Sequence, residues 1–200
     1  MPFRVLGPLE VVVDGQQVPL SGVTQRRTLA FLVLHANAVV PTRRLVQALW
    51  GDEPPATARK VLQNAISGLR TVLRRGAPGV AELATQAPGY VLRLDPDDVD
   101  LLRFLALAER GRAELTAGRR EAAATILSEA LALWRGPALA DLAEGGVDWP
   151  ELAASQAARL PRWKTGPRRG SPAATPVAWS PSWSRWWPAR ARRGSGCAAS

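Results

Sequence analysis

The sequence predicts an α+β domain over residues 1–94, an all-α segment over residues 95–158 and a disordered tail over residues 159–200. Short β-branched runs with turn signals open the chain, helical periodicity follows them, and a low-complexity stretch ends it. The charge balance changes at the same places, with 11 Lys/Arg against 5 Asp/Glu, then 6 against 12, then 9 against none. We therefore expect a basic module, an acidic module and a basic tail.

A small antiparallel sheet is expected at the N-terminus. Residues 3–13 are apolar and β-branched apart from an interruption at Gly7-Pro8. Asp14-Gly15 is a two-residue hairpin signal, after which residues 16–20 can return as a second strand.

Three helices are expected next. The first covers residues 24–37, and a short second helix runs from Thr42, as its N-cap, to Trp50. The third covers residues 57–75 and follows a turn at residues 51–55. Two helices joined by so tight a connection form a helix-turn-helix.

A β-hairpin is expected directly after the third helix. Residues 80–85 and 90–94 can pair as strands around a tip at residues 86–89. A hairpin in this place is a wing. Residues 1–94 thus predict a winged helix-turn-helix domain, made of an N-terminal antiparallel sheet, three helices and a β-hairpin wing.

The all-α segment begins with two amphipathic helices over residues 99–116 and 119–134. They are joined at Ala117-Gly118, where Gly118 can take the left-handed conformation of a helix C-cap. This pair has about the size of one tetratricopeptide-like repeat, a unit that needs neighbours to bury its apolar face. A further segment covers residues 137–152.

The helix at residues 57–75 has two contrasting faces. Its apolar stripe consists of Val61, Leu62, Ala65, Ile66, Leu69, Val72 and Leu73. Its other face consists of Arg59, Lys60, Gln63, Asn64, Ser67, Arg70, Thr71 and Arg74. A solvated helix face normally mixes both signs of charge, whereas this one has no carboxylate. Cations among Asn, Gln, Ser and Thr suit a groove of phosphates and base edges, so we predict that this face contacts DNA.

Further candidates for contact with the DNA backbone lie at helix ends and at the wing. The first turns of the first two helices hold Gln25, Arg26, Arg27, Arg43 and Arg44, where cations and free N–H groups can bind phosphate. Ordinary surface charge is the alternative. Trp50 either approaches the DNA backbone or plugs the core, and Gln86 and Tyr90 flank the wing tip, where Tyr90 either contacts DNA or packs.

Other function classes find little support. His35 is the only histidine and has no visible partner acid, and Cys197 is the only cysteine, so we expect no enzyme, no metal site and no cofactor. The acidic run at residues 95–100 lacks the glycine and distal glutamate of a calcium loop, and we interpret it as a linker and helix N-terminus. The sequence shows neither a signal peptide nor a membrane span, which indicates a cytoplasmic protein.

Several segments in order carry a family resemblance. LVQALWGDEPPATARKVLQNAISGLRTVL and the later APGYVLRL resemble the OmpR-type winged-helix domain. Residues 1–158 are similar to the antibiotic-pathway regulatory proteins (SARPs), on the stretches FRVLGPLEV, VLHANAVVPTRRLVQALWG, LQNAISGLR and ILSEALALWRGPALADL. The resemblance implies an OmpR-type domain joined to a bacterial transcriptional activator domain. It also implies an activator that binds direct repeats in double-stranded promoter DNA as a dimer or tandem array and recruits RNA polymerase.

The sequence departs from that family in two places. Gly68 stands where the family usually has an arginine on the side facing DNA, which implies weaker or altered DNA binding. The later helices of the activator domain are replaced by the tail, which holds five of the eight tryptophans. We interpret the tail as the downstream gene read in a shifted frame. Its nine cations and five tryptophans could alternatively bind nucleic acid.

Two rival functions remain open at this point. One is a tetratricopeptide-like adaptor that binds proteins without specific DNA readout. The other is a defective activator that occupies DNA without recruiting polymerase, because its helical domain is incomplete.

Overall fold

The computed structural model describes residues 2–159, so the predicted tail lies outside the described residues. Chain order begins with a three-stranded antiparallel sheet of β1 (Phe3–Arg4), β2 (Glu10–Val13) and β3 (Gln16–Gln17). The hairpin at Asp14-Gly15 is confirmed, and both residues have positive φ angles. The second strand of that hairpin is shorter than the predicted residues 16–20.

The helix-turn-helix is present as predicted. Helix α1 covers Val23–Leu34, α2 covers Thr42–Trp50 and α3 covers Ala58–Gly76. Thr42 is the first residue of α2 and not its N-cap, so that prediction is wrong. Its backbone N–H and its hydroxyl both donate to the carbonyl of Pro88, each at 3.3 Å, and this ties α2 to the wing.

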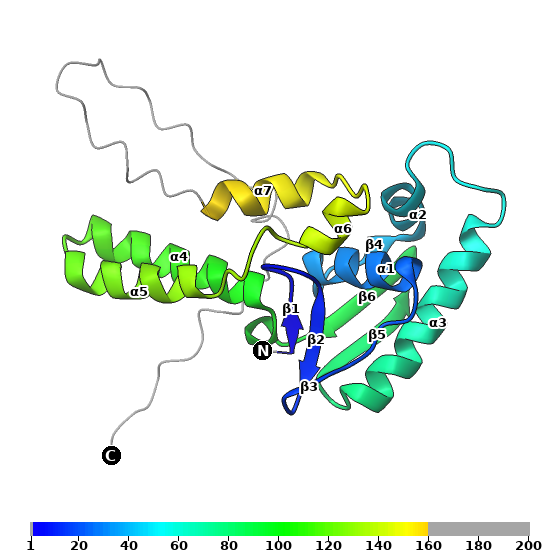
Figure 1. Cartoon of the computed structure of the whole chain (residues 1–200), viewed down its shortest axis with the longest axis horizontal. Helices are drawn as coiled ribbons and strands as arrows, with labels where there is room; N and C mark the ends of the chain where they lie inside the picture. Colours follow the sequence, from blue (N-terminus) through cyan, green and yellow to red (C-terminus); the bar gives the residue numbers. More distant parts are fainter. Residues whose placement is uncertain (1, 160–200) are drawn as a thin grey trace. The chain divides into compact units, whose positions relative to one another are not determined.

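The wing forms a second three-stranded sheet with a strand that the sequence did not predict. Strands β5 (Ala81–Gln86) and β6 (Gly89–Leu94) pair along their full length, from Ala81 opposite Leu94 to Gln86 opposite Gly89. Strand β4 (Val40–Pro41) joins the other edge of β6, giving the order β4-β6-β5. In Figure 1, α3 lies beside β5 and α1 crosses the same sheet. The winged α+β fold class is confirmed.

The all-α segment follows a single 3₁₀ turn at Pro96–Asp98. Helices α4 (Asp100–Thr116) and α5 (Arg120–Ala132) pack side by side as a hairpin, and Gly118 has a φ of 78°, as its C-cap role predicts. Two more helices, α6 (Ala140–Glu144) and α7 (Pro150–Arg159), return to the winged domain. No helix over residues 2–159 is long and apolar enough to cross a lipid bilayer.

One hydrophobic core runs through both parts of the described chain. Leu29 of α1 and Leu69 of α3 belong to it, as do Phe104 of α4 and Leu142 of α6. The N-terminal segment crosses from one part to the other, because Val5 and Leu6 accept backbone hydrogen bonds from Leu139 and Arg135. The two parts are therefore packed as one compact unit.

Asp100 holds the N-terminal segment in place where Val5 and Leu6 cross between the two parts of the chain. Its carboxylate is 2% exposed and accepts hydrogen bonds from the N–H groups of Val5, at 2.8 Å, and Leu6, at 3.0 Å. Asp100 is the first residue of α4, so the predicted helix N-terminus is confirmed, and the structure adds a buried anchoring role. Burial raises the pKa of Asp100 above its ordinary value, although these N–H groups and Arg135 act in the opposite direction.

Candidate nucleic-acid interface

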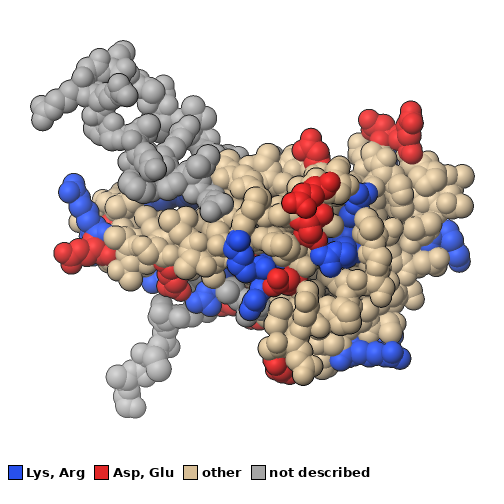
Figure 2. Space-filling view, viewed as in Figure 1, with Lys and Arg blue, Asp and Glu red and all other residues tan. Residues whose placement is uncertain are grey.

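Helix α3 places the predicted DNA-binding face in solvent. Its inner side is buried through Leu62, Ile66, Leu69 and Leu73. On its outer side Arg59, Lys60, Gln63, Asn64, Ser67 and Arg74 are exposed. Figure 2 shows basic side chains and no acidic ones over the length of α3, which agrees with the absence of Asp and Glu from this helix.

Four side chains in the N-terminal half of this face have no partner in the described part of the chain. Arg59, Lys60, Gln63 and Asn64 make no side-chain hydrogen bond and no ion pair within residues 2–159. Their donors and acceptors face solvent, so no protein contact has to break before they bind a ligand. We call these four residues the free face of α3.

Val61 lies beside the free face, although its spacing places it in the apolar stripe of the helix. It is 36% exposed, whereas Leu62 is fully buried. Val61 lies at the edge of the stripe, where neighbouring residues cover it incompletely. The apolar stripe is therefore buried along its centre and partly exposed at this edge.

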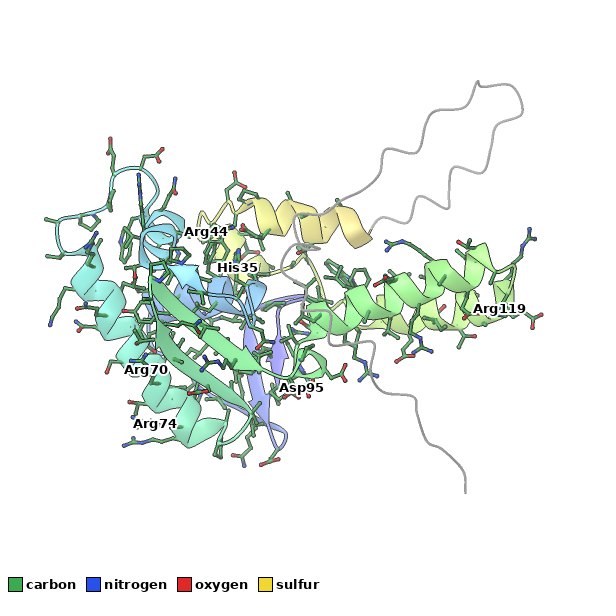
Figure 3. The ribbon with its side chains drawn as sticks, turned by 180° about the vertical axis from the view of Figure 1, so that it is seen from behind. His35, Arg44, Arg70, Arg74, Asp95 and Arg119 are labelled. Atoms are coloured by element: carbon green, nitrogen blue, oxygen red, sulfur yellow. The ribbon has the colours of Figure 1, made fainter. Side chains whose placement is uncertain are left out.

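Arg70 lies at the other edge of α3 and is used within the protein. Its Nε donates to the carbonyl of Leu83 at 2.8 Å, and its Nη2 donates to the hydroxyl of Thr85 at 2.6 Å. Figure 3 shows Arg70 where α3 lies beside the strands of the wing. Arg70 thus sets the position of the wing relative to α3, and two of its donors are occupied.

Gly68 faces α1. A Cβ atom at this position would overlap Nε2 of Gln25, whose amide lies over the helix backbone. Gly68 therefore admits a close approach between α1 and α3, and Gln25 occupies the space of a larger side chain. The carbonyl oxygen of that amide is buried without a hydrogen-bond partner among the described residues.

Three of the arginines predicted to contact phosphate form ion pairs or hydrogen bonds with the helical segment instead. Arg26 forms an ion pair with Asp141, and Nη2 of Arg27 donates to the carbonyl of Gly145 at 2.6 Å. Arg44 donates to Glu151 at 2.8 Å. These guanidinium groups join the winged domain to α6, to the residue after it and to α7. Arg43, by contrast, is exposed and has no ion pair within residues 2–159.

The remaining three candidates lie near the core or at the wing. Trp50 is half-buried and packs against the core, as does Tyr90. Gln86 is exposed beside the wing tip, and its side-chain oxygen accepts a hydrogen bond from Arg93 at 3.1 Å. Of these three, Gln86 alone is exposed.

A polar cluster that was not predicted from the sequence lies where α7 meets α1 and α2. Nε2 of His35 lies 3.1 Å from Oε1 of Glu151, and Nδ1 of the same ring lies 2.8 Å from the carbonyl of Phe31. His35 thus has the partner acid that we did not expect. Trp149 donates from Nε1 to the carbonyl of Ala48 at 2.8 Å and packs edge-on against Phe31. His35 and Arg44 lie together near one end of α7 in Figure 3.

The electrostatics of this cluster favour an ionised Glu151. Burial on its own would raise the pKa of that carboxyl, but the hydrogen bond from His35 and the positive charges of His35 and Arg44 outweigh burial and lower it to about 2. The cluster has no nucleophile, and its hydrogen bonds connect the two modules through Oε1 of Glu151, whereas Oε2 is buried without a partner among the described residues. Its geometry therefore suits a joint between them.

Comparison with known proteins gives matches for both parts of the chain. A family model described as "Transcriptional regulatory protein, C terminal" matches residues 15–92. A second model, "Bacterial transcriptional activator domain", matches residues 99–165. The two matches meet near the change of charge at residue 95.

Relatives of known name are similar over most of the chain. The transcriptional regulatory protein EmbR of Mycobacterium tuberculosis is 41% identical over 145 residues, which cover 71% of this chain and 37% of EmbR. The regulatory protein DnrI of Streptomyces peucetius is 35% identical over 166 residues, covering 80% of this chain and 61% of DnrI. A solved structure of Mycobacterium tuberculosis EmbR with a low affinity phosphopeptide has a TM-score of 0.72 and 39% identity. That match covers 78% of this chain and 42% of the EmbR chain. The chain thus spans about two fifths to three fifths of the length of these relatives.

Proposed function

The chain belongs to the SARP-type transcriptional regulators, and from this premise we propose that it binds specific promoter sequences in double-stranded DNA and activates transcription. The observation that carries the proposal is the free face of α3, where two cations and two amides face solvent without internal partners. Cations supply the salt-dependent attraction to phosphates, and amides supply the hydrogen bonds that distinguish bases. A surface free of acidic groups can enter a DNA groove without electrostatic repulsion.

The neighbouring elements support entry of α3 into the major groove. Helix α2 precedes α3 as the first helix of the helix-turn-helix, and the wing follows it. Exposed Arg43 at the start of α2 and Gln86 beside the wing tip extend the polar surface on both sides of α3. We propose that Arg43 and Gln86 contact the DNA backbone, while Arg59, Lys60, Gln63 and Asn64 enter the groove.

Activation, in this proposal, depends on the helical segment. Helices α4 to α7 match a bacterial transcriptional activator domain. They share the hydrophobic core of the DNA-binding domain and make polar contacts with α1 and α2. We propose that they transmit promoter binding to RNA polymerase, and that the protein acts in the cytoplasm as a dimer or tandem array on direct repeats. The names of its relatives support a role in a bacterial regulatory pathway.

A genomic-fragment pull-down tests the DNA-binding part of this proposal. The full chain is compared with a Lys60→Ala/Asn64→Ala variant, and Arg112→Ala serves as the matched control because Arg112 is an exposed cation on α4. We expect the wild type and the control to enrich a few fragments that share a repeated motif, and the double variant to lose that enrichment. Equal enrichment of all fragments by all three proteins would contradict the proposal and favour the adaptor function.

A further inference from the structure

We propose that Val61 contacts the 5-methyl group of a thymine in the major groove and so makes α3 select an A·T pair beside the base that Asn64 contacts. This inference rests on the proposed function and adds a specificity-determining residue to it. Four large apolar side chains are exposed among residues 2–159, and Val61, 36% exposed, is the one that lies on α3. The others are Val23, Leu115 and Leu131.

Position within the helix gives Val61 its role. Val61, Asn64 and Gly68 follow each other at steps of three and four residues, so they lie along one edge of α3. This edge is opposite to the one at which Arg70 contacts β5. Gly68 has no side chain and the Gln25 amide fills its place, so Val61 and Asn64 are the side chains that project from this edge in the N-terminal half of α3.

The chemistry of this edge matches two neighbouring A·T pairs. In the major groove the adenine of one pair presents an acceptor and a donor, which a side-chain amide can bind together, and the thymine of the next pair presents a methyl group. Asn64 supplies a free amide, and Val61 supplies a partly exposed apolar side chain about one helical turn away. A G·C pair offers no methyl group there, so Val61 would gain no apolar contact with it.

Substitution of thymidine by deoxyuridine isolates this contact, because deoxyuridine keeps the base pairing and lacks only the 5-methyl group. Binding sites are first selected from random duplexes with the full chain. Each thymidine of the selected site is then replaced singly. We expect affinity to fall about fourfold at one or two positions, the effect of one methyl group withdrawn from an apolar contact.

The Val61→Ala variant completes the test. It should bind the thymidine duplex about fourfold more weakly than the wild type and show no further loss on the deoxyuridine duplex, because the contact is already absent. Val23→Ala is the matched control, since Val23 is a 61% exposed valine outside α3. This control should keep the full deoxyuridine penalty. Unchanged thermal unfolding of both variants would show that they fold.

The outcomes separate this inference from the function on which it rests. A Val61→Ala variant that keeps the deoxyuridine penalty, or a selected site with no methyl-sensitive thymidine, would overturn the role of Val61 and leave sequence-specific binding intact. If the wild type selects no motif, the proposed function fails, and the inference fails with it.

Discussion

Oε1 of Glu151, on the last described helix, lies 3.1 Å from Nε2 of His35, at the end of α1, and the same oxygen accepts a hydrogen bond from Arg44. One carboxylate thus connects α7 to the two helices that precede α3. The DNA-binding domain and the helical segment are joined by specific polar contacts as well as by a shared hydrophobic core.

The first prediction concerns this carboxylate and pH. The pKa of Glu151 is lowered from 4.5 to about 2 in the folded protein, so its ionised form stabilises the fold above pH 4.5 and that stabilisation is lost as pH falls towards 2. We expect Glu151→Gln to lower the free energy of unfolding by about 2 kcal/mol at pH 6. This is less than the pKa shift alone would give, because Arg44 is partly exposed and solvent weakens its attraction to the carboxylate. Urea unfolding at a series of pH values measures this. If the free energies of unfolding of wild type and variant differed by the same amount down to pH 2, the lowered pKa of Glu151 would be contradicted.

The second prediction concerns Asp100, whose pKa shifts in the opposite direction. Asp100→Ala leaves the buried N–H groups of Val5 and Leu6 without an acceptor. We therefore expect it to lower the free energy of unfolding by about 2–3 kcal/mol. Because burial raises the pKa of Asp100, the stabilisation linked to its proton is present below the ordinary value of 3.8 and is lost as pH rises through the folded value. Asp100→Ala should therefore lower the free energy of unfolding by more at pH 3.5 than at pH 7. Asp97→Ala, at an exposed aspartate nearby, is the control and should change little.

The third prediction separates the roles of Arg70 and Asn64. Arg70→Ala removes both side-chain hydrogen bonds between α3 and β5, so hydrogen exchange of the wing amides should accelerate. DNA affinity should fall by a similar factor for all sequences, because the wing loses its position and no base contact is removed. Asn64→Ala should instead change the selected motif at one position. A changed base preference in the Arg70→Ala variant would show that Arg70 contacts a base directly.

The fourth prediction concerns Gly68. An alanine there would displace the Gln25 amide, which costs little because that amide ends a flexible side chain, while the helix gains up to about 1 kcal/mol from the loss of a mid-helix glycine. We expect Gly68→Ala to be between neutral and about 1 kcal/mol more stable in urea unfolding. Destabilisation by more than about 1 kcal/mol would mean that the contact between Gln25 and the helix is needed for the packing of α1 on α3.

Elements with a strong local signal were predictable from the sequence. The period of α3, the hairpin signal at Asp14-Gly15 and the C-cap at Gly118 each depend on residues a few positions apart. Strand β4 was missed because its two residues are too few to show a period, and its pairing with β6 is a tertiary contact.

Contacts between distant segments could not be predicted in the same way. Nothing near His35 in the sequence indicates Glu151, and nothing near Val5 indicates Asp100. Helical periodicity also assigns edge positions poorly, since exposure of Val61 depends on whether a neighbouring element covers it. The polar and basic side of α3, by contrast, was predictable from its sequence, whereas the hydrogen bonds of Arg70 to β5 were not. Contact of this side with DNA stays a prediction.

The last prediction tests which cations meet DNA. Each Lys or Arg that neutralises a phosphate adds about one to the slope of log affinity against log salt. Lys60→Ala should therefore weaken binding and reduce that slope by about one. Arg26→Ala and Arg27→Ala should leave the slope unchanged, because their guanidinium groups bind Asp141 and Gly145 of the helical segment, and should lower the free energy of unfolding by about 1 kcal/mol. Fluorescence anisotropy on one selected duplex from 50 to 300 mM salt measures the slopes. A slope reduced by Arg26→Ala as much as by Lys60→Ala would mean that the helical segment releases this arginine when DNA binds.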